Sequence, residues 1–220
     1  MHERPRFRYR DSEGSCFFRA QHLSPEETWE ALGRELARVL DEAQRAFWRQ
    51  PLRVDPDRIR WWHGAIFGRL FPHEGGRFRQ GPAFFGVVMP DGGLRQLEGA
   101  SPSIVRRELA VVCSAFNEAV ASFDRAGASS VLDRARTAAS LYAGIVRVHP
   151  FVDGNHRVGF VALSSALWSL GLSNIEFEED DDVIAHDDAL VPPLVSGEGS
   201  IEPFARLLAE LIERSTAPGP

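Results

Sequence analysis

The chain has 220 residues, a net charge of −6 and 44% hydrophobic residues. This length and apolar content suit one domain with a packed core, and the negative charge argues against direct binding of nucleic acid. All 25 basic residues are arginines, which excludes a P-loop lysine and a lysine nucleophile. The two cysteines, Cys16 and Cys113, are too few and too far apart for a metal framework, and the apolar surroundings of Cys113 predict a buried thiol.

Targeting and membrane signals are not recognisable in the sequence. No run of apolar residues is long enough to cross a membrane, so no membrane association is expected. The N-terminal residues carry several arginines without an apolar stretch and do not resemble a secretory signal peptide. We therefore expect a cytoplasmic protein, with a secreted effector as the alternative.

Apolar residues that recur every three or four positions predict a mostly α fold in a single domain, residues 1–220. Ser24, Pro25 and Glu27 mark the first helix start, because this N-cap, first-turn proline and capping-box glutamate satisfy the free backbone groups there. The predicted helices cover about 25–48, 56–70, 101–126, 130–149, 157–170, 182–189 and 201–212. A loop is expected from Pro192 to Ser200.

Two of these helices carry additional predictions. The helix that begins near residue 157 is apolar on nearly all sides, which indicates the buried centre of a bundle. Trp61, Trp62 and His63 lie in an apolar helical pattern and are interpreted as core or interface residues rather than as ligands. No internal repeat is visible.

A short β-hairpin is predicted at about 83–97. Its first strand, from Phe84 to Met89, is rich in aromatic and β-branched residues, as strands are. Asp91 and Gly92 then form a typical hairpin turn. By itself this pattern predicts an ordinary surface hairpin.

The stretch His149–Arg157, with the sequence His-Pro-Phe-Val-Asp-Gly-Asn-His-Arg, joins two predicted helices. Pro150 ends the upstream helix, because its ring removes a backbone donor and clashes with the preceding turn. Gly154 and Asn155 then fall at the N-terminus of the next helix, where free N–H groups and the helix dipole favour an anion. A histidine, a carboxylate and an anion cradle at one junction indicate a site for phosphate chemistry.

These nine residues resemble the signature loop of the Fic (filamentation induced by cAMP) and death-on-curing superfamily, His-Pro-Phe-x-Asp/Glu-Gly-Asn-Gly/Lys-Arg. His156 is the one misfit. The resemblance implies a Fic-type helical bundle with a small β-hairpin flap. It places the core at about 56–172, an N-terminal extension at 1–55 and a C-terminal helical extension at 173–214.

The resemblance also implies the chemistry: transfer of AMP from ATP to a Ser, Thr or Tyr hydroxyl of a target protein. His149 is the implied general base, which suits an imidazole near neutral pH. Asp153 is the implied ligand of Mg²⁺, an ion that typically takes one or two carboxylates plus phosphate oxygens. The implied phosphate contacts come from the rest of the loop: Gly154, Asn155, His156 and Arg157.

The hairpin gains a role from the same resemblance. The segment from Phe67 to Arg79 is similar to the part of Fic proteins that leads into the flap, which pairs with the target peptide by strand addition. The implied target-positioning residues are Arg79, Phe84, Phe85, Gly86 and Val87.

Two departures from the AMP-transferring pattern leave alternatives open. His156 stands where that subgroup has Gly and where death-on-curing toxins often have Lys. Phe160 replaces a second arginine that contacts the terminal phosphate. A death-on-curing-like protein kinase or another phosphate-linked transferase is therefore the alternative, and a catalytically inactive binding or regulatory module is the second. The family's inhibitory helix has only a weak counterpart at Glu13, which leaves two alternatives: inhibition by a separate, antitoxin-like protein, or no inhibition of this kind.

Overall fold

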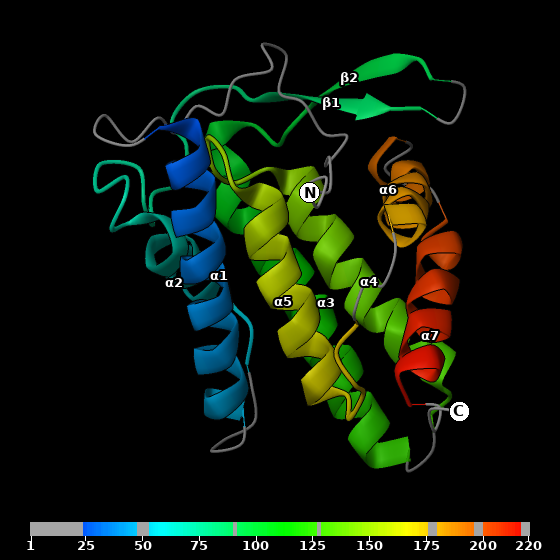
Figure 1. Ribbon diagram of the computed structural model, residues 1–220. Coiled ribbons are helices and arrows are strands. Elements are labelled where there is room, and N and C mark those ends of the chain that lie inside the picture. The colour runs from blue at the N-terminus through cyan, green and yellow to red at the C-terminus, as the bar shows by residue number, and fades with distance from the viewer. Residues whose placement is uncertain are drawn as a thin grey trace.

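The computed structural model describes residues 24–47, 53–89, 92–126, 129–175, 180–195 and 200–216. Its elements follow the chain as α1 (Pro25–Phe47), α2 (Pro56–Phe67), β1 (Phe84–Val88), β2 (Leu94–Glu98), a 3₁₀ turn η1 (Pro102–Ile104), α3 (Val105–Ala126), α4 (Val131–Val148), α5 (Asn155–Ser169), α6 (Asp180–Val195) and α7 (Glu202–Thr216). Figure 1 shows a bundle of helices with the two strands lying across one end. The predicted mostly α fold with one hairpin is confirmed.

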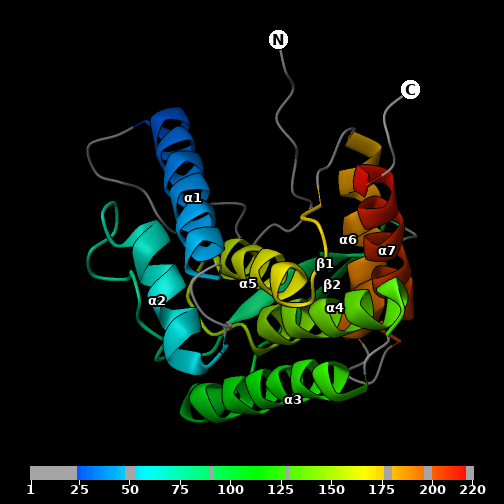
Figure 2. The same cartoon turned by 90° about the horizontal axis from the view of Figure 1, so that it is seen from below.

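Helix α5 forms the centre of the bundle, as its apolar sequence predicts. It packs against α1, α2 and α4, and both views show it between these helices (Figures 1 and 2). Its inward faces carry small residues that permit close approach. At Gly159, for example, an added Cβ would lie 3.0 Å from the ring of Tyr142 on α4. Because α5 is buried along most of its length, its N-terminus is held in a fixed position at the end of the bundle.

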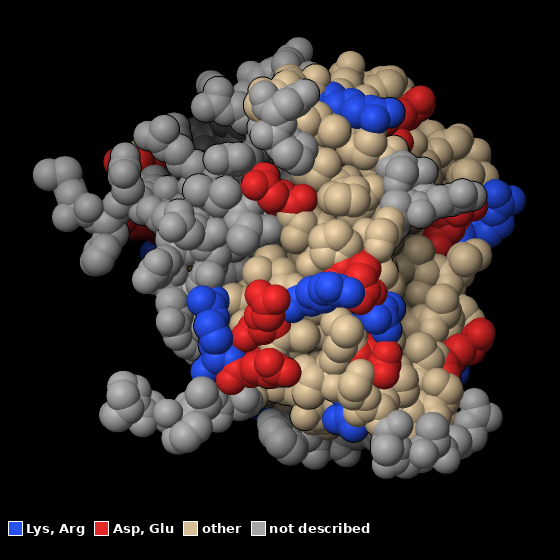
Figure 3. Space-filling view, turned by 90° about the vertical axis from the view of Figure 1, so that its right-hand side faces the viewer, with Lys and Arg blue, Asp and Glu red and all other residues tan. Residues whose placement is uncertain are grey.

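Helices α3, α6 and α7 form the outer layer around α4 (Figure 2). On the α6–α7 side, arginines and acidic residues are interspersed over the described surface (Figure 3). Glu202, for example, pairs with Arg136 at 2.9 Å and with Arg206 at 3.2 Å. Cys113 of α3 is buried, as predicted, and burial raises the pKa of its thiol to about 12.

Several helix starts use the residues that sequence indicates. Ser24 and Glu27 form the predicted capping box: the Ser24 N–H donates to the Glu27 carboxylate at 2.8 Å, and the Glu27 N–H donates to Ser24 Oγ at 3.2 Å. Asp55 caps α2 by accepting from the Arg58 N–H at 2.7 Å. These caps join residues only three positions apart, which explains why they can be predicted from sequence.

The boundaries of other helices differ from prediction. Helix α5 begins at Asn155, two residues before the predicted start, and α2 ends at Phe67 rather than at residue 70. The loop predicted from Pro192 is wrong, because α6 continues through Pro192 and Pro193 to Val195. A proline inside a helix removes a hydrogen bond and typically costs about 3 kcal/mol. Burial of neighbouring apolar side chains against α7, including Leu190, Val191 and Leu194, offsets this cost.

The hairpin predicted at 83–97 is confirmed. Strands β1 and β2 pair in antiparallel register, with Phe84 opposite Glu98 and Val88 opposite Leu94. Alternation along β1 buries Phe85 and Val87 towards the bundle. The predicted Asp91 turn residue, the N-terminal segment with Glu13 and Cys16, and residues 176–179 lie outside the described residues.

Candidate functional site

The predicted general base lies where α4 ends. The His149 N–H still donates to the Ile145 carbonyl at 3.1 Å, but the residue adopts the left-handed conformation with φ 51° and ψ 60°. It is the only non-glycine residue with positive φ in the described part of the chain. Such a conformation costs about 1–3 kcal/mol and persists only where the surroundings enforce it. The backbone at His149 is therefore held by the rest of the structure.

Arg79 provides much of this support. Its Nε donates to the His149 carbonyl at 2.6 Å, and its Nη atoms donate to the carbonyls of Gly81 and Ala100. Its backbone N–H donates to Pro150 O at 3.0 Å. The side chain is only 4% exposed. Arg79 thus braces the end of α4 against the segments on both sides of the hairpin, and its guanidinium faces inward rather than towards a bound target.

The imidazole of His149 lies under the hairpin. The Phe85 ring stacks on it with centroids 4.4 Å apart and planes 3° from parallel. Gly99, just after β2, passes so close that an added Cβ would lie 2.8 Å from the His149 Cβ. Only glycine fits this close approach. The hairpin therefore fixes the position of the ring as well as covering it.

Burial lowers the pKa of His149 from 6.5 to about 4. The positive charge of Arg79 acts in the same direction, whereas the Val146 carbonyl weakly favours the protonated ring. That carbonyl does not complete a hydrogen bond, and the buried Nδ1 of His149 has no partner among the described residues. The imidazole is consequently neutral near pH 7, which is the state a general base requires.

The loop after His149 is closed by its own asparagine. Asn155 Oδ1 accepts from the Phe151 N–H at 2.9 Å, and Asn155 Nδ2 donates to the Phe151 carbonyl at 3.1 Å. Asn155 is 3% exposed, and the Phe151 side chain is fully buried. Phe151 thereby anchors the loop in the core. The Asn155 amide, predicted to contact phosphate, is engaged within the loop, so we place it among the residues that shape the cradle.

His63 of α2 is a site residue that sequence reasoning did not recognise. Its Nδ1 accepts from the Gly76 N–H at 2.9 Å, which places the ring proton on Nε2, and Nε2 lies 3.1 Å from the Asp153 carbonyl. The ring also stacks on Phe151 with centroids 3.8 Å apart. His63 is 1% exposed, and burial lowers its pKa to about 4. The interpretation as a core residue is correct, but this core residue also holds the loop.

Gly154 begins helix α5 in the left-handed conformation, with φ 76°. An added Cβ would lie 2.2 Å from the Phe67 ring, so the space is filled by α2 rather than reserved for a ligand. The Gly154 N–H donates to the Asp153 carboxylate. This geometry directs the first turn of α5 towards the loop and favours an anion there.

The last residues of the loop are contacted by neighbouring helices. The Tyr142 hydroxyl of α4 lies 3.1 Å from His156 Nδ1. The Arg157 guanidinium lies over the Trp29 ring of α1, with Cζ 4.5 Å from the centroid. Phe160, where the resemblance leads one to expect a second arginine, is partly buried against the hydrophobic core. His149, Asp153, His156 and Arg157 all lie at the junction of α4 and α5.

A sequence model of the Fic/DOC family matches residues 53–167, which is more than half of the chain. The chain belongs to the Fic/DOC family. This confirms the resemblance seen in the loop. Helix α1 lies outside the matched segment, although it contributes Trp29 to the loop's surroundings.

Curated relatives and solved structures agree with this assignment. A protein adenylyltransferase Fic from Culex quinquefasciatus is 27% identical over 153 residues, which cover 70% of this chain and 26% of the relative. One from Drosophila willistoni is 27% identical over 186 residues, which cover 84% of this chain and 32% of that relative. The chain thus spans between a quarter and a third of the length of these relatives.

Among solved structures, a Fic domain containing signalling protein from Bacteroides thetaiotaomicron superposes with a TM-score of 0.62 and 22% identity, covering 86% of this chain and 69% of the other. The effector BepC from Bartonella tribocorum, solved with bound AMPPNP, gives a TM-score of 0.59 and 15% identity, covering 92% and 90%. At these identities the likeness establishes the Fic fold.

The Fic flap, hairpin β1–β2, presents its residues in two directions. Phe84 is 47% exposed, whereas Phe85, Gly86 and Val87 are buried. Of the flap positions predicted to position a target, Phe84 is therefore the one whose side chain is accessible. Phe85 contacts His149 instead.

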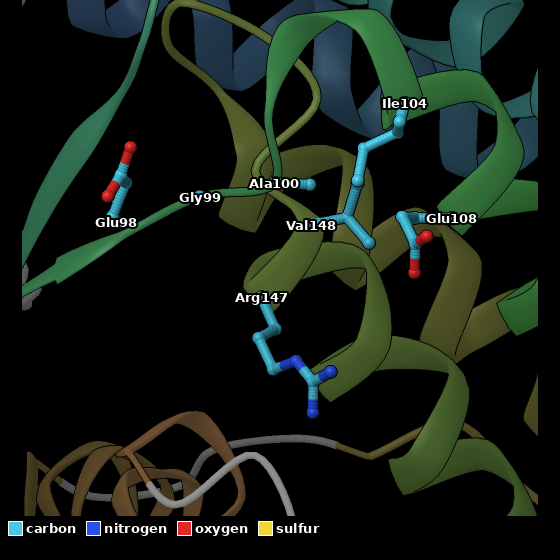
Figure 4. A pocket seen from close by; sticks show the side chains of 7 residues that line it. All are labelled: Glu98, Gly99, Ala100, Ile104, Glu108, Arg147 and Val148. Atoms are coloured by element: carbon cyan, nitrogen blue, oxygen red, sulfur yellow. The ribbon is translucent and has the colours of Figure 1, made fainter.

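A cleft of about 330 Å³ lies next to the flap, between the end of β2, the start of α3 and the end of α4. Glu108 reaches into it from α3 and Arg147 from α4, and Glu98 lies at its edge (Figure 4). The cleft adjoins His149 through Gly99 and Val148. Its lining carries both signs of charge.

Asp153 is the one carboxylate of the Fic loop, and it is partly exposed. Over the residues that the structure describes, no group of three or more His, Cys, Asp or Glu side chains forms a metal cluster, and no helix is long and apolar enough to cross a membrane. A single accessible carboxylate fits Mg²⁺ that arrives with a nucleotide, because this ion usually keeps several waters and takes phosphate oxygens.

Proposed function

We propose that this Fic/DOC protein is a protein adenylyltransferase that transfers AMP from ATP to a hydroxyl side chain of a target protein. The observation that supports this most directly is the imidazole of His149, stacked under the Phe85 ring at the end of α4 and neutral near pH 7. The names of the curated relatives and the AMPPNP bound to the BepC structure point in the same direction.

In the proposed reaction, His149 accepts the proton of the target hydroxyl. The hydroxyl oxygen attacks the α-phosphorus of ATP, the bond from that phosphorus to the β-phosphate oxygen breaks, and pyrophosphate leaves. Bound nucleotide adds negative charge near the imidazole, which raises the pKa of His149 from its low value in the unliganded protein. The base is thereby strengthened when the substrate is present.

The remaining loop residues bind and orient the nucleotide. Arg157 offers a planar set of donors to phosphate oxygens, and the first turn of α5 offers backbone N–H groups. His156, held at Nδ1 by Tyr142, is proposed to donate from Nε2 to a phosphate oxygen. Asp153 is proposed to hold Mg²⁺, which when bound neutralises phosphate charge. The exposed Phe84 of the flap is proposed to contact the target.

Two departures from the AMP-transferring pattern favour a second candidate, transfer of the γ-phosphate as in a death-on-curing-like kinase. Phe160 is packed against the core and offers no donor to a terminal phosphate. His156 adds bulk and a donor at a position where the AMP-transferring loop has glycine. If these residues set the nucleotide's direction, Phe160→Arg should change which phosphate is transferred or how fast.

Labelled ATP distinguishes the candidates. The wild type and His149→Ala are incubated with Mg²⁺, a cell lysate and ATP labelled on either the α- or the γ-phosphate. We expect protein labelling from α-labelled ATP alone, and none from the variant. Labelling only from γ-labelled ATP would establish the kinase instead. If neither label is transferred, the inactive binding module is supported.

A further inference from the structure

The guanidinium of Arg157 lies close to two aromatic side chains from different helices. Its Cζ is 4.5 Å from the ring centroid of Trp29 on α1 and 5.8 Å from that of Phe67 at the end of α2. Phe67 lies within the segment that matches the Fic/DOC family, but Trp29 lies outside it. Part of the surroundings of the predicted phosphate-binding arginine thus comes from the N-terminal extension.

The placement of Trp29 is fixed by its neighbours on α1. The capping box of Ser24 and Glu27 sets the start of the helix, and Thr28 and Leu32 are buried, the latter fully. Helix α1 packs along α5, which carries Arg157. Trp29 itself remains 44% exposed, and the guanidinium of Arg157 lies over its ring.

We propose that α1 completes the nucleotide site, with Trp29 as a positioning residue for Arg157. This inference rests on the proposed function. A cation over an aromatic face is attracted by the ring, and the contact uses the face of the guanidinium while its N–H donors lie in the guanidinium plane. The contact with the ring therefore does not itself engage these donors. Holding the long side chain beforehand reduces the ordering that binding would otherwise require.

Substitutions at Trp29 test this role, and the chain supplies a matched control. Trp61 on α2 is 48% exposed and also has an arginine over its ring, Arg58 at 5.9 Å. Binding of AMPPNP with Mg²⁺ is measured by titration calorimetry for the wild type, Trp29→Leu, Trp29→Phe and Trp61→Leu. No target protein is present, so the measurement does not depend on transfer.

We expect Trp29→Leu to raise the dissociation constant about three- to thirty-fold, the range of a cation–π contact from exposed to desolvated sites. Trp29→Phe should restore most of the affinity, because phenylalanine keeps an aromatic face. Trp61→Leu should bind like the wild type. Thermal unfolding of each variant confirms that Trp29→Leu is folded.

A double-mutant cycle separates positioning from a general packing effect. If Trp29 acts through Arg157, Trp29→Leu should change affinity less than about twofold when Arg157 is already Ala. The inference about Trp29 would be overturned if the wild type and Trp29→Leu bound AMPPNP equally well. It would also be overturned if Trp29→Leu weakened binding as much in the Arg157→Ala background as in the wild type. Neither result would contradict the proposed function. A wild type that binds no nucleotide would overturn the proposed function together with it.

Discussion

His63 offers the clearest test of how the active loop is held. Phenylalanine at this position keeps an aromatic ring against Phe151 but removes the hydrogen bonds with the Gly76 N–H and the Asp153 carbonyl. A buried polar group that loses its partner costs about 1–3 kcal/mol. Both groups are part-buried, so we expect His63→Phe to lower the free energy of unfolding by about 2–4 kcal/mol near neutral pH.

The effect of this substitution should depend on pH. Burial lowers the pKa of His63 to about 4 in the folded protein, against 6.5 in the unfolded chain. Between pH 4 and pH 6.5 the unfolded chain binds a proton at His63 that the folded protein does not bind. The contribution of His63 to the free energy of unfolding is therefore complete above about pH 6.5 and declines as the pH falls. From about pH 7.5 to about pH 4.5 the wild type should lose about 2.5 kcal/mol through this residue. The His63→Phe variant does not lose this free energy, because phenylalanine binds no proton.

Urea unfolding followed by circular dichroism measures both quantities. The destabilisation by His63→Phe should be about 2.5 kcal/mol smaller at about pH 4.5 than at about pH 7.5. His149 titrates in both proteins and cancels from the comparison. His73→Asn is the control, because this histidine is exposed, and it should leave the pH dependence unchanged. A destabilisation by His63→Phe that stays constant over the whole pH range would refute a buried, neutral His63.

Three further predictions concern the flap and the loop. Phe85→Ala removes the ring that covers His149, so the pKa of His149, followed by NMR, should rise towards 6.5; an unchanged pKa would mean that Phe85 does not bury the ring. Gly99→Ala should lower the rate of transfer by at least about tenfold, because the added methyl group displaces His149, whereas Gly81→Ala, with open space around it, should not. Gly154→Ala should lower the free energy of unfolding by about 1–3 kcal/mol and weaken AMPPNP binding. The reasons are the positive φ of this residue and the Phe67 ring, which would lie 2.2 Å from the added Cβ. A melting temperature and an affinity equal to those of the wild type would contradict this.

The loop shows how far sequence alone reaches. Nine consecutive residues carry the family resemblance, and the helix stop at Pro150 follows from local sterics. Capping boxes and apolar periodicity likewise act over one or two helical turns, which is why α1, α4 and the hairpin are predictable. The fold class and the position of the site therefore follow from local patterns in the amino-acid sequence.

The partners of the site residues do not follow from such patterns. His63 looks like an ordinary core histidine, and its role comes from Gly76 and Asp153, the latter 90 residues away. Arg79 belongs to the flap in sequence, but its side chain turns inward to carbonyls at the end of α4. No local pattern signals these contacts, because they form only when the bundle assembles.

The same distinction applies to chemistry. The sequence by itself determined that a histidine, a carboxylate and an arginine meet at a helix junction, because covalent connectivity places them within nine residues. Only the tertiary structure decided that the imidazole of His149 is buried and neutral, that Asn155 shapes the loop, and that Trp29 lies over Arg157. Burial and long-range contacts depend on which helices pack together, and packing is a property of the whole chain.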